Sequence, residues 1–278
     1  MIILDVIAEP FMQRAILACC LTGVVCACVG VVVITMRLAF IGVCMSHAAF
    51  AGALVGLLVG APPLALAFPA SLMAAALVGP LADRSDFSPD TALGIIFAST
   101  LGVSFIILGL MPGSKAPALG LLWGSVLTAG RIDLWVLGGV TAVIVILAFV
   151  FFKEIQAVVF DRRVAAAVGL PATALFYGIL TAAGAAITAS LHVVGGLLVF
   201  SLMINPAAAA QQLTYRLDRM LIIAAALGIV SALLGLAVSY LADLPSGAVI
   251  VVASSVVFGV AFALSPKRRA ARAGRGAI

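Results

Sequence analysis

The sequence predicts an all-α membrane protein with about eight or nine transmembrane helices, and three observations support this fold class. Hydrophobic residues fill 65% of the 278 positions and charged residues only 9%, whereas soluble domains carry about 25% charged residues. Apolar runs continue for about 20 residues, the length that a helix needs to cross hydrocarbon. Apolar and polar residues do not alternate within these runs, as they would in the strands of an outer-membrane barrel.

Nine segments are long and apolar enough to be candidate spans, and we assign them to a single transmembrane domain over residues 1–278. A tenth apolar stretch, Leu119–Ala129, is too short to cross and is predicted to be re-entrant or interfacial. A count of eight would follow if two neighbouring segments formed one broken helix. The nine predicted spans are Met12–Thr35, Leu38–Val59, Pro62–Ala82, Thr91–Met111, Ile132–Phe152, Pro171–Ser190, His192–Ala210, Arg219–Leu241 and Ser246–Ser265.

Glycine spacing in the second span indicates close packing of helices. Gly52, Gly56 and Gly60 recur every four residues and predict a smooth face of the kind that lets helices approach closely in membranes. All the cysteines lie in the first two spans without zinc-finger or paired C-x-x-C spacing, and we interpret them as small apolar packing residues. They are Cys19, Cys20, Cys26, Cys28 and Cys44.

Two later segments carry signals for a helix start and a helix bend. Ser88 is a preferred N-cap residue and Pro89 suits the first helical position, so a helix is predicted to start there. Pro206 removes a backbone hydrogen bond inside the seventh span and predicts a bend or a break. Asn205, beside it, is expected to bond to a neighbouring helix, with a role in a substrate pathway as the alternative.

Basic residues predict the orientation of the bundle, because cytoplasmic loops carry an excess of Lys and Arg. With the basic tail 266–278 placed in the cytoplasm, twelve basic residues fall on that side and three, Arg14, Lys115 and Arg131, on the other. An odd number of spans then puts the N-terminus outside. The tail suits the anionic headgroups of membrane lipids, and no nucleic-acid partner is expected because no folded soluble module accompanies it.

Two histidines are candidates for contact with a substrate. His47 is the ionisable side chain nearest the middle of a predicted span, and such groups are functional candidates because the bilayer core does not hydrate them. The alternative is a neutral histidine bonded to a neighbouring carbonyl. His192 is predicted at the outer end of its span, where it would face a docked partner, although an interfacial histidine needs no special role.

The segment from Lys153 to Gly169 is too polar to cross the membrane and falls on the predicted cytoplasmic side. Within it, Asp161–Val168 has the pattern of a short helix with charge at its start, ended by Leu170–Pro171. One interpretation is a solvated connection. The other is a docking helix for a cytoplasmic partner, with a charged rim and an alanine-rich contact face.

Several motifs in order resemble the permease subunits of ATP-binding-cassette importers. The run from Phe160 to Pro171 resembles their coupling segment, F-D-x-x-x-A-x-x-x-G-L-P. Val194–Val199 with Pro206–Ala210 resembles V-G-x-L-L-V…P-A-A-x-A, Asp243–Gly247 resembles D-L-P-S-G, and Gly124–Leu127 resembles G-x-x-L. Ser46–His47–Ala48, followed by Gly52, resembles the S-H-A-x-x-P-G of the divalent-metal branch, which is related to the cobalamin and siderophore permeases.

The resemblance extends from about Arg14 to Pro266 and implies a type II importer bundle in the bacterial inner membrane. It implies a homodimer, two cytoplasmic ATPase subunits that bind ATP, and an extracytoplasmic metal-binding protein. The chain itself has no G-x-x-x-x-G-K-[ST] loop, so it is expected to be a transport subunit, without enzyme activity or a resident cofactor. The residues implied in ATPase coupling are Phe160, Asp161, Arg162, Arg163, Ala165, Gly169, Leu170 and Pro171.

Two departures from the metal-branch pattern affect the expected metal. Members commonly carry an Asp four residues before the histidine, where this chain has Val43, and a proline where it has Ala51. Cys44, three residues before His47, is a candidate substitute ligand. Sulfur with imidazole favours zinc over manganese, because manganese prefers oxygen donors. The sequence therefore predicts transport of a divalent metal ion past His47, with zinc first and manganese and iron next.

A self-contained secondary metal transporter or channel is the competing function. Such proteins place several charged residues within their spans to carry protons or coupling ions, and this sequence offers one histidine and no carboxylate there. A membrane scaffold without transport activity is a third possibility, but it would leave His47 and the polar segment after Lys153 without a role.

Overall fold

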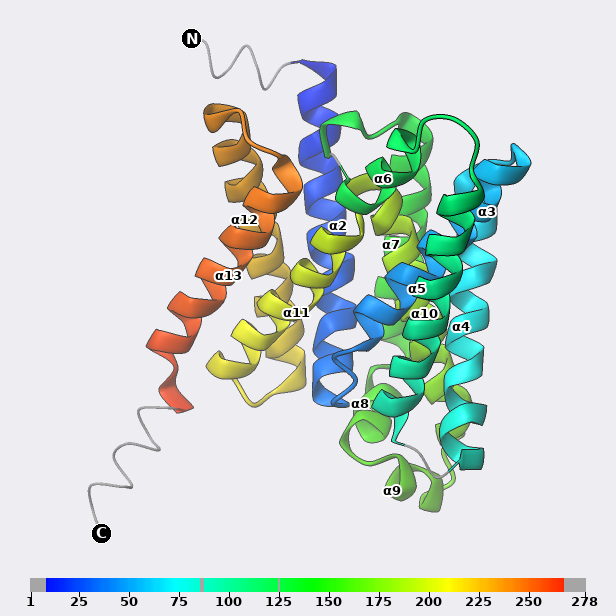
Figure 1. Cartoon of the computed structure of the whole chain (residues 1–278). Coiled ribbons are helices and arrows are strands. Elements are labelled where there is room, and N and C mark those ends of the chain that lie inside the picture. Colours follow the sequence, from blue (N-terminus) through cyan, green and yellow to red (C-terminus); the bar gives the residue numbers. More distant parts are fainter. Residues whose placement is uncertain (1–8, 86–87, 125, 268–278) are drawn as a thin grey trace.

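The computed structural model describes residues 9–85, 88–124 and 126–267. Over these residues the chain forms a bundle of long helices, and no strand occurs in this part of the chain. Figure 1 shows the long helices running between two ends of the bundle. We call these the α9 end, which carries the short helices α8 and α9, and the α6 end, which carries α6.

Within the described residues there are thirteen helical elements, and their order follows the predicted spans closely. The elements are α2 (Pro10–Thr35), α3 (Ile41–Val59), α4 (Pro63–Ser85), α5 (Pro89–Leu110), α6 (Ala116–Trp123), the 3₁₀ helix η1 (Val126–Thr128), α7 (Arg131–Val150), α8 (Phe152–Phe160), α9 (Arg162–Ala167), α10 (Ala172–Val194), α11 (Gly196–Leu213), α12 (Leu217–Ala242) and α13 (Ser246–Leu264).

Eight described helices are long and apolar enough to cross a membrane, namely α2, α3, α4, α5, α7, α10, α12 and α13. The remaining predicted span corresponds to α11, an 18-residue helix that packs against α2, α12 and α13. At about 1.5 Å per residue it is about 27 Å long, and it runs from the α6 end to the α9 end (Figure 1). The short stretch Leu119–Ala129 covers the later part of α6 and all of η1, at one end of the bundle. It does not cross the bundle, as the sequence predicted.

The predicted boundary between the sixth and seventh spans is wrong. His192 does not start a new helix but belongs to the last turn of α10, which continues to Val194. The chain turns at Gly195, whose φ of 87° is a backbone conformation that glycine adopts without steric cost. The predicted N-cap at Ser88 is confirmed, since its hydroxyl accepts a hydrogen bond from the Thr91 N–H at 3.2 Å.

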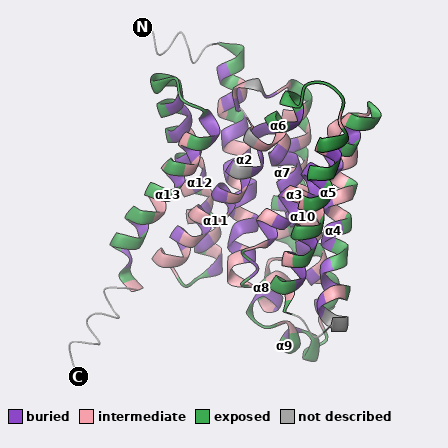
Figure 2. Ribbon diagram, in the orientation of Figure 1, coloured by how far each residue is buried: buried purple, intermediate pink, exposed green. Residues whose placement is uncertain are grey.

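Burial is concentrated in the helices at the centre of the bundle. Figure 2 shows purple, buried residues along α2, α3 and α10, while α5 and α13 carry broad green, exposed faces. Within the most apolar 18-residue stretch of each helix, 72% of the residues of α3 are buried, but only 22% of those of α5 and of α13. The exposed faces must therefore be covered by lipid or by another protein, because apolar side chains do not face water over so large a surface.

Small residues bring the central helices into backbone contact. A Cβ atom on Gly52 would collide with the Leu66 carbonyl oxygen of α4, and one on Gly56 would lie 3.1 Å from the Pro63 Cα. Gly60 departs from this expected packing face. It ends α3 with a φ of 72°, and a Cβ there would meet nothing within 4 Å, so its role is the turn and not the helix contact.

Replacing Gly52 with alanine should destabilise the bundle, because the added methyl group forces α3 away from the backbone of α4. Overpacking of this kind costs about 1–3 kcal/mol. We expect a lower thermal unfolding midpoint for the purified chain in lipid nanodiscs. Gly139→Ala is the matched control, because a Cβ at Gly139 in α7 meets open space. Equal midpoints for the two variants would contradict the packing described here.

Candidate functional site

His47 lies closer to one end of its helix than the sequence predicts. The turn at Arg37, with a φ of 60°, delays the start of α3 to Ile41, so His47 is the seventh residue of a 19-residue helix. At about 1.5 Å per residue, its Cα lies about 9 Å from the start of α3. The predicted position at the midpoint is therefore wrong, and His47 lies in the half of the helix nearer the α9 end.

The His47 ring occupies a half-buried strip of an otherwise buried helix. Between Ile41 and Leu54, Val43 and His47 are the two residues that keep partial exposure. They are four residues apart and so share one face of α3. Val43, which stands where the metal branch commonly carries Asp, thus opens onto the same side of the helix as His47.

One nitrogen of His47 has no visible partner. Its Nδ1 atom is buried and makes no hydrogen bond among the described residues. The imidazole packs edge-on against Phe97 of α5, with ring centroids 5.0 Å apart. The alternative reading, a histidine bonded to a carbonyl, is therefore not supported at Nδ1. A buried polar atom without a partner is costly, and a bound cation or water would relieve that cost.

Cys44 and His47 both lie against Phe97. Cys44 is fully buried and contacts the Phe97 backbone, while His47 contacts the Phe97 ring. Phe97 is a residue that sequence reasoning missed, because an aromatic residue in an apolar span gives no signal by itself. Among the described residues, no group of three or more His, Cys, Asp or Glu side chains surrounds a common point, so this chain alone does not enclose a metal ion at His47.

The second histidine meets a carboxylate that was not singled out from the sequence. His192 Nε2 in the last turn of α10 lies 3.5 Å from Asp133 Oδ1 in the first turn of α7. The other carboxylate oxygen of Asp133 accepts a hydrogen bond from the Gly130 N–H at 3.0 Å. Both side chains are half-buried. Both side chains lie at the α6 end of the bundle. The opposite end of α7 connects to α8, and the opposite end of α10 follows α9, so those ends lie at the α9 end.

Asn205 joins two helices through a set of hydroxyl groups. Its Nδ2 lies 3.2 Å from Ser201 Oγ on α11 and 3.0 Å from both Ser254 Oγ and Ser255 Oγ on α13. This is the bond to a neighbouring helix that the sequence led us to expect. α11 continues through Pro206 to Leu213, so the proline does not break the helix.

The segment from Phe160 to Pro171 forms a rigid elbow between α7–α8 and α10. Asp161 is the N-cap of α9, and its Oδ1 accepts from the N–H groups of Arg163 at 2.7 Å and Val164 at 3.1 Å. Gly169 follows α9 with a φ of 86°, and Leu170–Pro171 leads into α10. Arg162 fixes the elbow to α10 by a hydrogen bond to Thr173 at 3.2 Å.

The exposed surface of this elbow includes Ala166 and Ala167 and the charged Asp161 and Arg163, and larger apolar side chains contribute to it as well. Ala165 is 1% exposed and packs inward with Val158 and Ala172. The outward side also carries Phe160, Val164 and Val168. Phe160, at 89% exposure, projects from the bundle without a packing partner large enough to cover it, so a separate protein is the natural cover for this surface.

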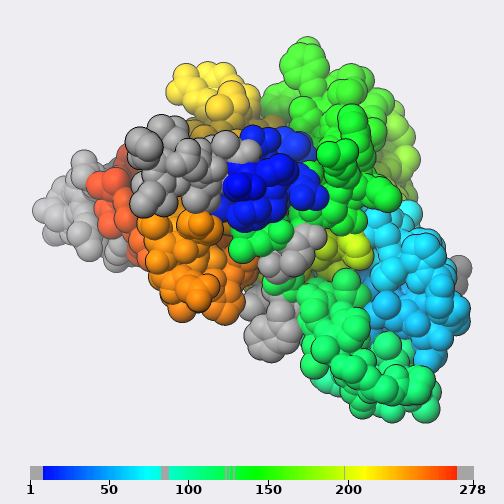
Figure 3. Space-filling model, turned by 90° about the horizontal axis from the view of Figure 1, so that it is seen from above, coloured from blue at the N-terminus to red at the C-terminus, as the bar shows by residue number. Residues whose placement is uncertain are grey.

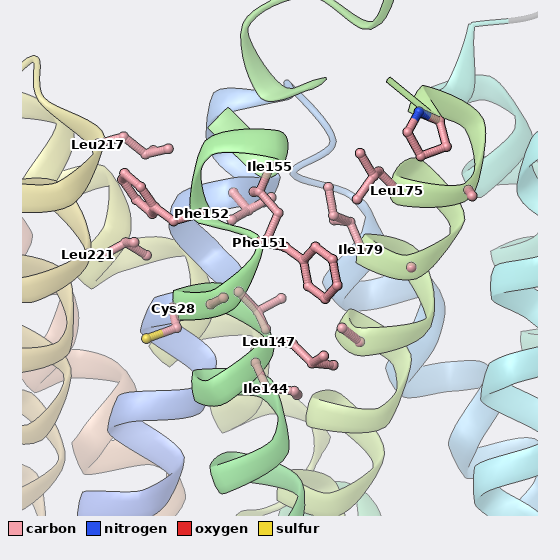
Figure 4. Close-up of a pocket in the computed structure, with 17 residues that line it drawn as sticks. Cys28, Ile144, Leu147, Phe151, Phe152, Ile155, Leu175, Ile179, Leu217 and Leu221 are labelled. Carbon is pink, nitrogen blue, oxygen red and sulfur yellow. The ribbon is translucent and has the colours of Figure 1, made fainter. Parts of the chain in front are cut away.

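An apolar cavity of about 300 Å³ is lined by residues of α2, α7, α8, α10 and α12, with Pro171 at the end of the elbow among them. Figure 4 shows Phe151 directed toward Ile179 and Phe152 directed toward Leu217 and Leu221, with Cys28 on another wall. Its lining offers one thiol and no charged group. A divalent ion needs several oxygen, nitrogen or sulfur donors, so this cavity is not a metal site.

Comparison with known proteins agrees with this arrangement. The model of the ABC 3 transport family matches residues 8–265. This chain belongs to the ABC 3 transport family. The manganese transport system membrane protein MntC of Halalkalibacterium halodurans is 31% identical over 95% of this chain and 90% of its own length. The chelated iron transport system membrane protein YfeD of Yersinia pestis is 31% identical over 91% of this chain and 85% of its own length.

Solved structures support the same fold. The structure of PsaBC from Streptococcus pneumoniae in complex with Fab aligns with a TM-score of 0.86 at 27% identity and covers 97% of this chain and 98% of that chain. An inward-facing conformation of a putative metal-chelate type ABC transporter aligns with a TM-score of 0.74 at 17% identity, which supports the fold alone. The chain is thus the permease subunit of an ATP-binding-cassette metal importer, and it has no ATPase site of its own.

The predicted resemblance, fold class and lack of enzyme activity are confirmed by these comparisons. The roles of individual site residues stay predictions. Ser125 of the G-x-x-L motif and the basic tail beyond Lys267 lie outside the described residues. Lys267 itself donates a hydrogen bond to the Gln211 carbonyl.

Removing the carboxylate of Asp161 should loosen α9 locally. Asp161→Ala leaves the N–H groups of Arg163 and Val164 without their cap, which costs about 1 kcal/mol and should speed amide exchange at residues 163–168 about fivefold. Hydrogen–deuterium exchange of the chain in nanodiscs measures this. Asp161→Ser keeps a capping oxygen and should exchange at close to the wild-type rate. Unchanged protection in Asp161→Ala would show that the cap does not hold α9 in place.

Proposed function

We propose that this chain is the membrane subunit through which a divalent transition metal enters the cell, with manganese as the first candidate and iron as the next. The observation that carries this proposal is the half-buried strip of α3, where His47 has a buried nitrogen without a partner. The names of the related manganese and iron permeases support the choice of metal. The Cys44–His47 spacing favours zinc, which is the third candidate.

The proposed assembly is a homodimer with two ATPase subunits at the α9 end and an extracytoplasmic metal-binding protein at the α6 end. In the dimer, each protomer would contribute one His47, giving a two-ligand gate. Two ligands suit a pathway, because conduction needs binding that is strong enough to admit the ion and weak enough to release it. The exposed apolar faces of α5 and α13 are the surfaces available for contact between protomers.

The orientation proposed here puts the α9 end and the C-terminus in the cytoplasm of a bacterial cell, with the chain in the inner membrane. Basic residues support it. Among the described residues, seven Lys or Arg side chains lie at the α9 end and three lie at the α6 end, a bias of the kind that cytoplasmic loops carry. The seven are Arg37, Lys153, Arg162, Arg163, Arg216, Arg219 and Lys267.

The elbow, together with α8, would transmit the ATPase movement. It continues directly into α7 on one side and α10 on the other, and Arg162 ties it to α10 through Thr173 and through the Phe176 ring, 4.5 Å from the guanidinium. Closure of the ATPases would push on Phe160, Val164 and Val168. The push would move α7 and α10 together and so change access to His47 from the two sides of the membrane.

His47→Ala should lower metal uptake about tenfold or more, because the ion loses a ligand worth at least about 1.4 kcal/mol at the barrier. The measurement is accumulation of manganese, iron and zinc by cells that lack the permease and carry the wild type or a variant. Cys44→Ser should reduce zinc accumulation selectively if sulfur is a ligand, and Cys20→Ser is the control, since Cys20 lies on α2. Normal accumulation of all three metals by His47→Ala would refute the proposed pathway.

Phe160→Ser combined with Val164→Ser should uncouple ATP hydrolysis from uptake, because the docking surface loses its exposed apolar side chains. We expect uptake to fall about tenfold while the thermal unfolding midpoint of the chain is unchanged. Leu241→Ser, an exposed apolar residue at the α6 end (76% exposed), serves as the matched control. Wild-type uptake in the double variant would place the ATPase contact elsewhere.

A further inference from the structure

His192 and Asp133 lie at the end of the bundle where the transported ion would enter under the proposed function. α10 begins next to Pro171 of the elbow and ends at Val194, about 34 Å away at 1.5 Å per residue for its 23 residues. Asp133 lies at the corresponding end of α7. The pair is therefore at the end of the bundle opposite the elbow, which the proposed function assigns to the metal-binding protein.

The separation of the two side chains suits a shared ion better than a direct bond. Nε2 and Oδ1 are 3.5 Å apart, whereas a charge-assisted hydrogen bond is usually about 2.7–2.9 Å long. Two donors that each lie about 2.1 Å from a tetrahedral metal ion are about 3.4 Å from each other. The observed gap is of the size that a first-row divalent ion spans.

Neighbouring backbone holds both donors in place. The Gly130 N–H binds Asp133 Oδ2, which leaves Oδ1 directed toward His192. Gly195 ends α10 three residues after the histidine. Gly124 packs tightly against it, since a Cβ on Gly124 would lie 2.4 Å from the Gly195 Cα. A hydrogen-bonded carboxylate on a fixed helix end is the kind of support that metal ligands receive from surrounding groups.

The pair is accessible without being fully solvated. The side chains of His192 and Asp133 are 24% and 22% exposed. Seen from above in Figure 3, yellow-green atoms in the colour of the end of α10 are visible between green and cyan segments. An ion released at this face would reach the pair without crossing the core, and water or the donor protein would fill its remaining coordination positions.

Imidazole and carboxylate together define the class of ligand. Imidazole nitrogen suits zinc, copper, iron and nickel, and carboxylate oxygen suits manganese, magnesium and calcium, so a mixed site fits the same manganese, iron and zinc ions as the proposed cargo. Two protein ligands are too few to trap an ion permanently, since closed structural sites use four. Such a site holds an ion briefly and passes it on.

We propose that His192 and Asp133 form an outer acceptor site for the transported cation, occupied after the ion leaves the binding protein and before it reaches His47. This inference rests on the proposed function. A purely structural role, in which the pair only joins α7 to α10, makes the opposite prediction for metal binding, because that role requires no cation.

The test is Mn²⁺ binding to the full-length chain in lipid nanodiscs, followed by the loss of the free-ion electron paramagnetic resonance signal. His192→Gln keeps an N–H donor for Asp133, and Asp133→Asn keeps an oxygen for the Gly130 N–H, so both variants preserve the bonds of a structural contact. We expect each to weaken Mn²⁺ binding about tenfold or more and to slow manganese uptake at limiting external concentration.

Equal Mn²⁺ affinity in wild type and His192→Gln would overturn the inference, and so would weakened binding with unchanged uptake. A structural contact alone would show as normal Mn²⁺ affinity and an unchanged unfolding midpoint in both variants, because each keeps the bonds of that contact. Failure of the proposed function looks different, because in that case the wild-type chain would not restore accumulation of manganese, iron or zinc to cells that lack the permease.

Discussion

The fold depends on close contact between helix backbones at the centre of the bundle. In lipid, helices gain little from burying apolar side chains against one another, so dispersion contacts between small residues provide much of the attraction. Gly30 lies against the carbonyl of Met203, Gly23 against Gly228, and Gly52 against Leu66. These contacts join α2 to α11 and α12, and they join α3, which carries His47, to α4.

Polar groups in this centre are few, and most have a partner. Ser71 donates to the Gly184 carbonyl, and Asn205 meets three serine hydroxyls between α11 and α13. Against that background the unpaired Nδ1 of His47 is an exception. A bilayer supplies no water to satisfy such an atom, so an unpaired buried nitrogen is more informative here than it would be in a soluble domain.

Much of the fold could be predicted from the sequence, because the length of an apolar run alone decides whether a helix crosses hydrocarbon. Details that depend on local backbone conformation were less predictable. The turn at Arg37 shifts the start of α3 and moves His47 off the midpoint, and Gly195, not the region of Leu191, separates α10 from α11. The short helix that begins after Asp161 was predictable from the local sequence, whereas the coupling role of this residue stays a prediction. Phe97 and Asp133 meet their histidines only through tertiary packing, which no spacing along the chain reveals.

The exposed strip of α3 offers a cation a nitrogen ligand but no negative charge, since Val43 stands one turn before His47. A divalent ion beside this strip carries two positive charges, and no side chain of the strip neutralises them. The transmembrane electrical potential acts on each such charge with about 2.3 kcal/mol per 100 mV over the full thickness. That work is done on the ion whichever side chain stands at position 43, so in the proposed pathway the effect of valine is confined to a weaker electrostatic attraction for the cation at this strip, which favours its release over its retention.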